Sequence, residues 1–90
     1  MTDTKIPHLP VAPYAAPALT SPRERLVRAA GDLWRVQEAA TDRILGHLRI
    51  AVDPLGLRYR AEHLHRATGA FRVIGEFWRA DDAVQALRTG

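Results

Sequence analysis

Alternation of apolar and charged residues is the clearest pattern in this chain, and it falls in the second half. Residues 57–62 alternate strictly between the two classes, which is the period of a strand with one buried face and one solvated face. A run rich in aromatic and β-branched residues at 71–78 predicts another strand, in which Gly75 marks a bulge or a close backbone approach. Runs at 33–37 and 43–50 are similarly enriched, so four strands are predicted.

Turn-forming residues separate these runs. Residues 53–56 (Asp-Pro-Leu-Gly) put proline at the second position and glycine at the fourth position of a turn. Thr-Asp at 41–42 and Thr-Gly at 68–69 stand at the other two boundaries. The four strands are therefore expected to form an antiparallel meander.

Two helices are predicted outside the sheet. Residues 21–24 (Ser-Pro-Arg-Glu) combine a capping serine, a proline at the first helical position and a glutamate where a capping box needs it, which predicts a short helix that ends at Gly31. Asp81 and Asp82 precede an apolar stripe that is typical of a second short helix. The predicted fold is therefore α+β, with a short N-terminal helix, a four-stranded antiparallel meander and a C-terminal helix packed on the sheet.

A mainly helical fold is the alternative. Apolar residues between positions 22 and 50 also lie near a helical period, which would give one long helix over residues 22–50. The strand interpretation ranks first, because the runs at 33–37 and 43–50 are rich in aromatic and β-branched residues and a turn signal stands between them.

The first twenty residues differ in composition from the rest. Pro7, Pro10, Pro13 and Pro17 are separated mostly by small or apolar residues, and proline at this density blocks both helix formation and strand pairing. We expect residues 1–20 to form a flexible proline-rich arm, either disordered or polyproline-like, with an extended partner-bound form as the alternative. Residues 21–90 are expected to form a single small α+β domain.

The size and composition of this domain argue against catalysis. A domain of roughly 70 residues buries only about 60% of its unfolded surface, which leaves little interior to seclude a substrate. The chain has no cysteine, and therefore no disulfide, thiolate nucleophile or cysteine-ligated zinc. It also lacks a nucleophile motif and a phosphate-binding glycine loop. We expect no enzyme activity, no cofactor and no small-molecule substrate.

The N-terminal residues and the hydropathy predict a cytoplasmic protein. Residues 1–7 have neither the charged segment nor the apolar run of a signal peptide. No run of roughly eighteen apolar residues occurs anywhere in the chain. We therefore expect no membrane partner.

The positive charge is carried by arginine. The formal net charge is +3, and twelve of the thirteen basic residues are arginines. The planar guanidinium fork binds phosphate and carboxylate groups, whereas the codon usage of a GC-rich genome is the alternative explanation of the arginine and alanine content.

Strict alternation places these arginines on one face of the predicted sheet. The face toward the helix would hold Ile44, Leu48, Ile50, Leu57, Tyr59, Ala61, Phe71, Val73 and Phe77, with Trp34 and Val36. The other face would also carry His47 and a few acids such as Glu62 and Glu76. The candidate macromolecule-binding residues on or near it are Arg35, Arg43, Arg49, Arg58, Arg60, Arg72 and Trp78.

Three interpretations of this face follow from its chemistry. Arginine can bind phosphates and guanine edges, and a sheet can lie in the major groove of DNA. An acidic protein is the second partner type, and a solvated face whose arginines pair with nearby carboxylates is the third interpretation. We expect a small accessory binding protein that docks on a protein complex through its arm and this face, with direct DNA or RNA binding as the alternative.

The histidines and the adjacent aspartates predict neither a metal site nor a catalytic site. His63 and His65 have the spacing that puts two imidazoles on one face of a strand, but His47 on the neighbouring strand has the opposite predicted facing. No paired carboxylate completes a four-ligand set, so no metal site is predicted. Asp81 and Asp82 point about 100° apart on a helix, and capping explains them better than catalysis.

Four segments resemble the pattern of small, uncharacterised proteins from GC-rich bacteria: residues 33–36 (Leu-Trp-Arg-Val), 46–48 (Gly-His-Leu), 58–61 (Arg-Tyr-Arg-Ala) and 75–84 (Gly-Glu-Phe-Trp-Arg-Ala-Asp-Asp-Ala-Val). This resemblance covers residues 32–88 and implies a strand-rich fold without a known activity. More loosely, a meander that ends in Gly-x-Phe before two acids and Ala-Val is similar to ethylene-response-type and integrase arm-binding DNA-binding domains. The sheet enters the major groove in those families, so the looser resemblance implies DNA binding.

Overall fold

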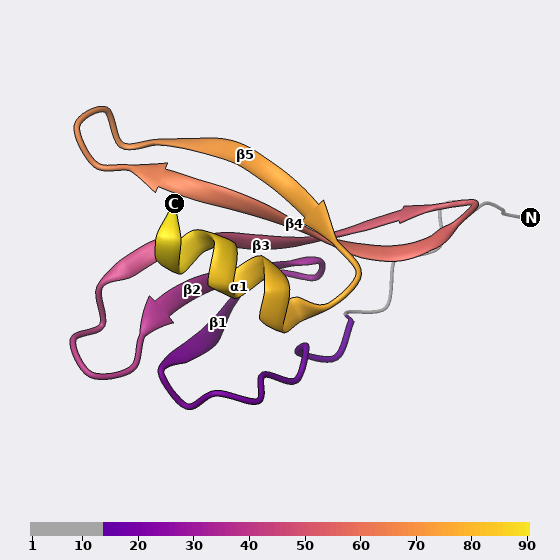
Figure 1. The fold of residues 1–90 in the computed structure, drawn as a ribbon, viewed down its shortest axis with the longest axis horizontal. Helices are drawn as coiled ribbons and strands as arrows, with labels where there is room; N and C mark the ends of the chain where they lie inside the picture. The colour runs from indigo at the N-terminus through magenta and orange to yellow at the C-terminus, as the bar shows by residue number, and fades with distance from the viewer. Residues whose placement is uncertain (1–13) are drawn as a thin grey trace, which may run out of the picture.

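The computed structural model describes residues 14–90 and contains one antiparallel sheet with one helix. The elements follow in the order β1 (Glu24–Ala30), β2 (Leu33–Glu38), β3 (Ile44–Asp53), β4 (Gly56–His65), β5 (Ala70–Phe77) and α1 (Ala80–Thr89). Neighbouring strands in the sheet are neighbours in the chain, and α1 lies across one side of the sheet (Figure 1). The expected α+β class, the antiparallel meander and the C-terminal helix are confirmed. Within the described residues, no helix is long and apolar enough to cross a lipid bilayer.

The predicted N-terminal helix is wrong, because residues 24–30 form strand β1. The Ser21 hydroxyl accepts a hydrogen bond from the Arg23 N–H at 3.2 Å, so the capping sequence makes a local turn instead of a helix start. Pairing with β2 lets Leu26 pack against the core, and this tertiary contact overrides the local helix signal. The sheet therefore has five strands instead of the predicted four.

The alternative of one long helix over residues 22–50 is also wrong, because β1, β2 and most of β3 occupy this range. The turns were predicted correctly. In the β3–β4 turn the Asp53 carboxylate accepts a hydrogen bond from the Leu55 N–H at 2.8 Å, and Gly56 adopts a φ of 132° that side chains disfavour. Asp42, between β2 and β3, has a φ of 61°, which aspartate tolerates better than most residues.

The core lies between α1 and the sheet. It is formed by small and aliphatic side chains of β2, β3, β4 and α1: Val36, Leu45, Leu48, Ala61, Ala80, Ala83, Val84 and Leu87. Gly46 allows the helix to approach, because a Cβ at this position would lie 3.0 Å from the Leu87 side chain and would collide with the Glu62 carbonyl. Trp34 and Ile50, also predicted for this side, are buried as well.

A bulge in β3 changes the facing of two residues. Gly46 lies opposite Val36, but Ile44 lies opposite Gln37, so Leu45 is the extra residue. Because directly opposed residues share a face, Leu45 enters the core and Ile44 turns to the side away from α1. The prediction that Ile44 faces the helix is therefore wrong.

A second bulge changes the facing of β5. Gly75 lies opposite Ala61 and Val73 lies opposite Glu62, which makes Ile74 the extra residue. Phe71 and Val73 therefore lie on the side away from α1, where they are 40% and 58% exposed. The predicted helix-facing position of both residues is wrong, and Gly75 is the sequence feature that indicated this bulge.

Residues 14–20 belong to the predicted arm, yet they contact the domain. Leu19 packs against the core, and the backbone N–H and hydroxyl of Thr20 donate hydrogen bonds to the Asp81 carboxylate at 2.9 and 3.0 Å. The Tyr14 N–H donates to the Gly31 carbonyl at 3.1 Å. The flexibility expected for the rest of the arm, residues 1–13, concerns positions outside the described residues.

Candidate interaction surface

The sheet has a side that α1 does not cover, and we call it the open face (Figure 1). Strand alternation and the register place charged and aromatic side chains on it. It comprises Arg35, His47, Arg49, Arg58, Arg60, Glu62, Phe71, Val73, Glu76 and, next to the end of β5, Trp78.

Five of the seven candidate binding residues meet on the open face, and two do not. Arg35, Arg49, Arg58 and Arg60 have the predicted facing. Arg43 lies in the β2–β3 turn, where Nη2 donates to Glu38 Oε2 at 2.9 Å. Arg72 faces the α1 side opposite His63, because the bulge at Ile74 reverses the facing of the β5 residues before it relative to those after it. The predicted facing of Arg43 and Arg72 is therefore wrong.

Carboxylates on neighbouring strands pair with the open-face arginines. Arg49 Nε donates to Glu62 Oε2 at 3.1 Å, and Arg60 Nε donates to Glu76 Oε2 at 3.0 Å. Both pairs are charge-assisted hydrogen bonds, which hold the guanidinium groups flat against the sheet. Arg49 and Arg60 are thus ordered before any partner arrives.

Arg58 lies between Glu76 and a third acid, Asp53. Its Nη2 pairs with Asp53, and its Nε lies 3.7 Å from Glu76 Oε1. Asp32 adds a fourth carboxylate, 4.0 Å from Arg49 Nη1. Four arginines and four carboxylates therefore meet on or beside the open face, so its net charge is close to zero.

His47 adds no charge to the open face at neutral pH. Its ring stacks on Phe71 with 3.8 Å between the ring centroids and 8° between the planes. Burial lowers the pKa of His47, and this effect outweighs the Glu62 carboxylate, which lies 3.6 Å from Nδ1 and favours the charged form. The neutral imidazole thus acts as a packing surface for Phe71.

Exposed aromatic and aliphatic side chains border the ion pairs. Trp78 is 59% exposed, and the Arg58 guanidinium lies 5.3 Å from the centroid of its ring, within cation–π range. Phe71 and Val73 extend this apolar area along β5. Sequence reasoning found Trp78 by its parity but missed Phe71 and Val73, because it assumed strands without bulges.

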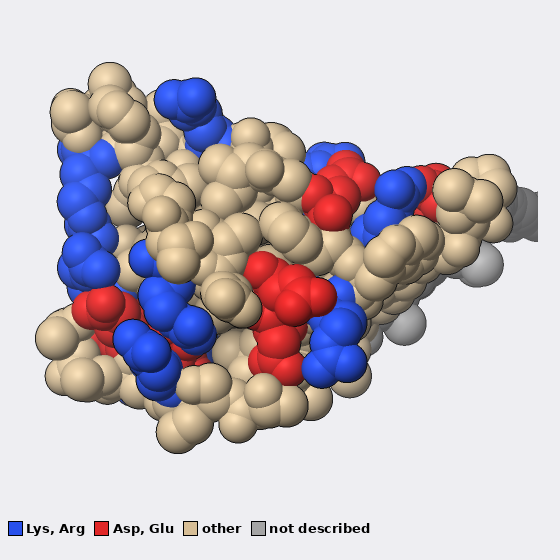
Figure 2. Space-filling model, in the orientation of Figure 1, with Lys and Arg blue, Asp and Glu red and all other residues tan. Residues whose placement is uncertain are grey.

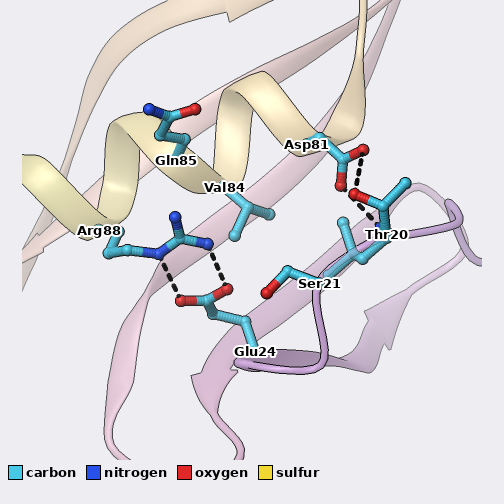
Figure 3. A pocket seen from close by; sticks show the side chains of 8 residues that line it. Thr20, Ser21, Glu24, Asp81, Val84, Gln85 and Arg88 are labelled. Carbon is cyan, nitrogen blue, oxygen red and sulfur yellow. Dashed lines mark hydrogen bonds and ion pairs between the residues drawn. The ribbon is translucent and has the colours of Figure 1, made fainter.

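A small hollow on the α1 side is built from groups that bind one another (Figure 3). It measures about 120 Å³ and lies between residues 19–24 and α1. Arg88 donates from Nε and Nη2 to the two oxygens of Glu24 at 2.8 and 2.7 Å, and the Glu24 side chain is only 3% exposed. Because Asp81 is likewise bonded to Thr20, this hollow joins β1 to α1 and holds no unpaired catalytic group among its described contacts.

The histidines do not form a metal centre in the described part of the chain. His47 lies on the open face and His63 on the α1 side, and residues 14–90 hold no group of three or more histidine, aspartate or glutamate side chains that could bind a metal ion. Comparison with family models, curated proteins and solved structures finds no match to this chain. The fold and the surface define a structural class only, an antiparallel sheet closed on one side by a single helix, and the family resemblances stay predictions.

Proposed function

We propose that this protein is a small non-catalytic docking protein that binds a partner protein through the open face. The observation that carries the proposal is the pairing of the open-face arginines with carboxylates next to exposed aromatic side chains. Residues 1–13 lie outside the described residues, so the proposal rests on the open face alone.

The charge balance favours a protein over a nucleic acid. Nucleic-acid binding draws its affinity from net positive charge that replaces the counterions of the phosphates. The carboxylates of Glu62 and Glu76 oppose that effect, since a phosphate backbone on this face would lie close to them. A protein surface carries no such uniform charge, and its backbone carbonyls can accept the arginine N–H groups that Glu62 and Glu76 leave unused.

The composition of the open face supports the same conclusion. Tryptophan, phenylalanine and arginine are enriched in protein interfaces, and lysine is depleted. Trp78, Phe71 and Val73 offer apolar area, and the ion pairs keep Arg49 and Arg60 ordered. An ordered side chain loses less entropy on binding, so we expect Trp78 and Phe71 to be the anchors.

Site-specific photo-crosslinking in the native host tests the proposal. A crosslinking amino acid at Val73 probes the open face, and the same amino acid at Gln85, which is exposed on α1, is the matched control. We expect one protein to be captured from position 73 and not from position 85, with the same yield after nuclease treatment. Trp78→Ala should abolish that capture, whereas Gln85→Ala should leave it unchanged.

Direct DNA or RNA binding predicts the opposite result. Capture would then depend on nucleic acid, and the purified protein would shift short duplexes or single strands with an affinity that falls steeply with salt. Equal capture from positions 73 and 85, or loss of capture after nuclease treatment, would contradict a protein-docking role of the open face.

A further inference from the structure

A second hollow lies where α1 ends, between the β2–β3 and β4–β5 turns. It measures about 220 Å³ and is lined by basic and apolar residues: Arg43, Leu45, His63, Leu64, His65, Arg66, Leu87, Arg88 and Gly90. We call it the basic pocket. Its lining contains three arginines and two histidines but no aspartate or glutamate side chain, and Figure 2 shows arginine side chains gathered along this edge of the molecule.

Each arginine of the basic pocket is held by a protein acceptor. Arg43 donates to Glu38 at 2.9 Å, Arg66 Nη2 donates to the Ile44 carbonyl at 2.8 Å, and Arg88 donates twice to Glu24. A guanidinium has five N–H groups, so these bonds fix its position and leave other N–H groups for a ligand. The pocket is therefore ordered in advance, which lowers the entropic cost of binding.

Arg66 in the lining of the basic pocket and Arg72 beside it form no ion pair with a carboxylate of the described residues. Glu38 and Glu24 balance Arg43 and Arg88, whereas no ion pair within residues 14–90 involves Arg66 or Arg72. Arg72 lies beside the pocket, opposite His63 in the sheet register. Part of the surplus positive charge of residues 14–90 is thus located here, and the sequence-based assignment of Arg72 to the open face missed it. Arg23, Arg28 and Arg35, which lie elsewhere, likewise have no ion pair within these residues.

We propose that the basic pocket binds a phosphate group. The planar arginine fork matches the oxygens of phosphate, and Leu45 and Leu87, whose side chains belong to the core, line the same hollow, which reduces competition from water. The α1 C-terminus opposes an anion with about half an elementary charge, and the carboxylate of Gly90 in the lining opposes it further. Binding therefore depends on direct hydrogen bonds from the guanidinium groups of the lining to the phosphate oxygens. At about 220 Å³ the pocket is smaller than the roughly 300–1,000 Å³ of sites for drug-sized ligands, so it suits the phosphate group rather than a large cofactor.

NMR titration of the full chain tests this site. The ¹⁵N-labelled protein is titrated with sodium phosphate, and sodium chloride of matched ionic strength is the reference. We expect saturable shifts at the amides of residues 43–45, 63–66 and 87–90. Arg66→Ala should weaken phosphate binding about tenfold, which is the effect of losing one charged hydrogen bond.

The matched control is Arg79→Ala, because Arg79 is an exposed arginine before the opposite end of α1 and pairs with Asp81. It should leave the phosphate affinity unchanged. Arg66→Lys keeps the charge but loses the fork, so its affinity should fall between those of the original chain and Arg66→Ala. Since Arg66 is an exposed turn residue, all three variants should fold, which their amide spectra will show.

A short single-stranded oligonucleotide distinguishes the source of the phosphate. Binding at the same amides that is tighter than inorganic phosphate and falls steeply with salt assigns the pocket to a nucleic-acid backbone. Binding no tighter than inorganic phosphate assigns it to a free phosphorylated molecule. Absence of saturable shifts, equal shifts with chloride, or an Arg66→Ala affinity equal to that of Arg79→Ala would overturn the proposal. None of these results bears on crosslinking from Val73, since the pocket and the open face are separate surfaces.

Discussion

Replacing Arg88 by methionine tests the ion pair that joins α1 to β1. The substitution keeps most of the side-chain volume and removes both hydrogen bonds to Glu24. Glu24 would then be a carboxylate whose side chain is only 3% exposed, without its partner. An unpaired buried charge of this kind costs about 3–5 kcal/mol, and because the Arg88 side chain is 27% exposed, water can reach part of the vacated space. We therefore expect a loss of about 2–3 kcal/mol.

The double variant Glu24→Leu with Arg88→Met separates this explanation from a simple loss of packing. Replacing both partners by apolar residues removes the unpaired charge, and such replacements are often neutral or stabilising. We expect the double variant to recover most of the stability that Arg88→Met loses, so the two changes should be strongly non-additive.

Urea denaturation measures this effect as a change in the midpoint at constant slope. Gln85→Met is the control, because Gln85 is an exposed residue on the same helix. A loss below about 0.5 kcal/mol for Arg88→Met, which is the range of ordinary surface substitutions, would refute the reasoning. A double variant whose loss equals the sum of the single losses would refute it as well.

Three further predictions follow from the same contacts. Gly46→Ala should destabilise the domain by about 1–3 kcal/mol in urea denaturation, because its Cβ would collide with the Glu62 carbonyl of β4 and press on the Leu87 side chain of α1. An unchanged midpoint would contradict this close packing around Gly46. Burial lowers the pKa of His47. The contribution of His47 to the free energy of unfolding is therefore complete above about pH 6.5 and is lost as the pH falls toward the lowered pKa. His47→Phe should flatten this part of the stability–pH curve, and an unchanged curve would refute the prediction. The hydrogen bond from the Thr20 backbone N–H, and to a smaller extent the one from its hydroxyl, lowers the pKa of Asp81. The stability that Asp81 contributes is therefore present above the usual pKa of 3.8 and is lost as acid protonates the carboxylate in the folded protein. An Asp81 carboxyl that titrates by NMR at 3.8 or above would contradict this prediction.

Much of the sheet was predictable from local signals. Strict alternation at residues 57–62 and the turn at 53–56 are enough to place β3 and β4 beside each other, and the two aspartates at 81–82 mark the start of α1. These signals work because the same residues serve both the local conformation and the burial against α1.

β1 was not predictable in the same way, because its first residues carry a complete helix-start signal. Only the pairing of Leu26 with β2, a contact between distant positions, decides the conformation. The bulges at Leu45 and Ile74 were not predictable either. One extra residue reverses the facing of the side chains before it relative to those after it, so the residues that precede each bulge were assigned to the wrong face.

The charge balance of the open face depends on contacts that the sequence does not show. Folding brings Asp32 next to Arg49 and Glu76 next to Arg60. Pairing across strands cannot be read from a linear window. Of the arginines without an ion pair within residues 14–90, Arg66 lines the basic pocket, and Arg72 lies beside it instead of on the predicted open face.

Because α1 follows all five strands in the chain, the hydrophobic face of the sheet is synthesised before the helix that buries it. The ribosome adds about 5–20 residues per second, so roughly 1–6 s separate the addition of Ala61 from that of the last residue of α1. During this interval Val36, Leu48 and Ala61 have no helix to pack against. A nascent chain of this architecture is thus most prone to aggregation just before α1 has been synthesised. Translational pausing after β5 should lower the yield of folded protein.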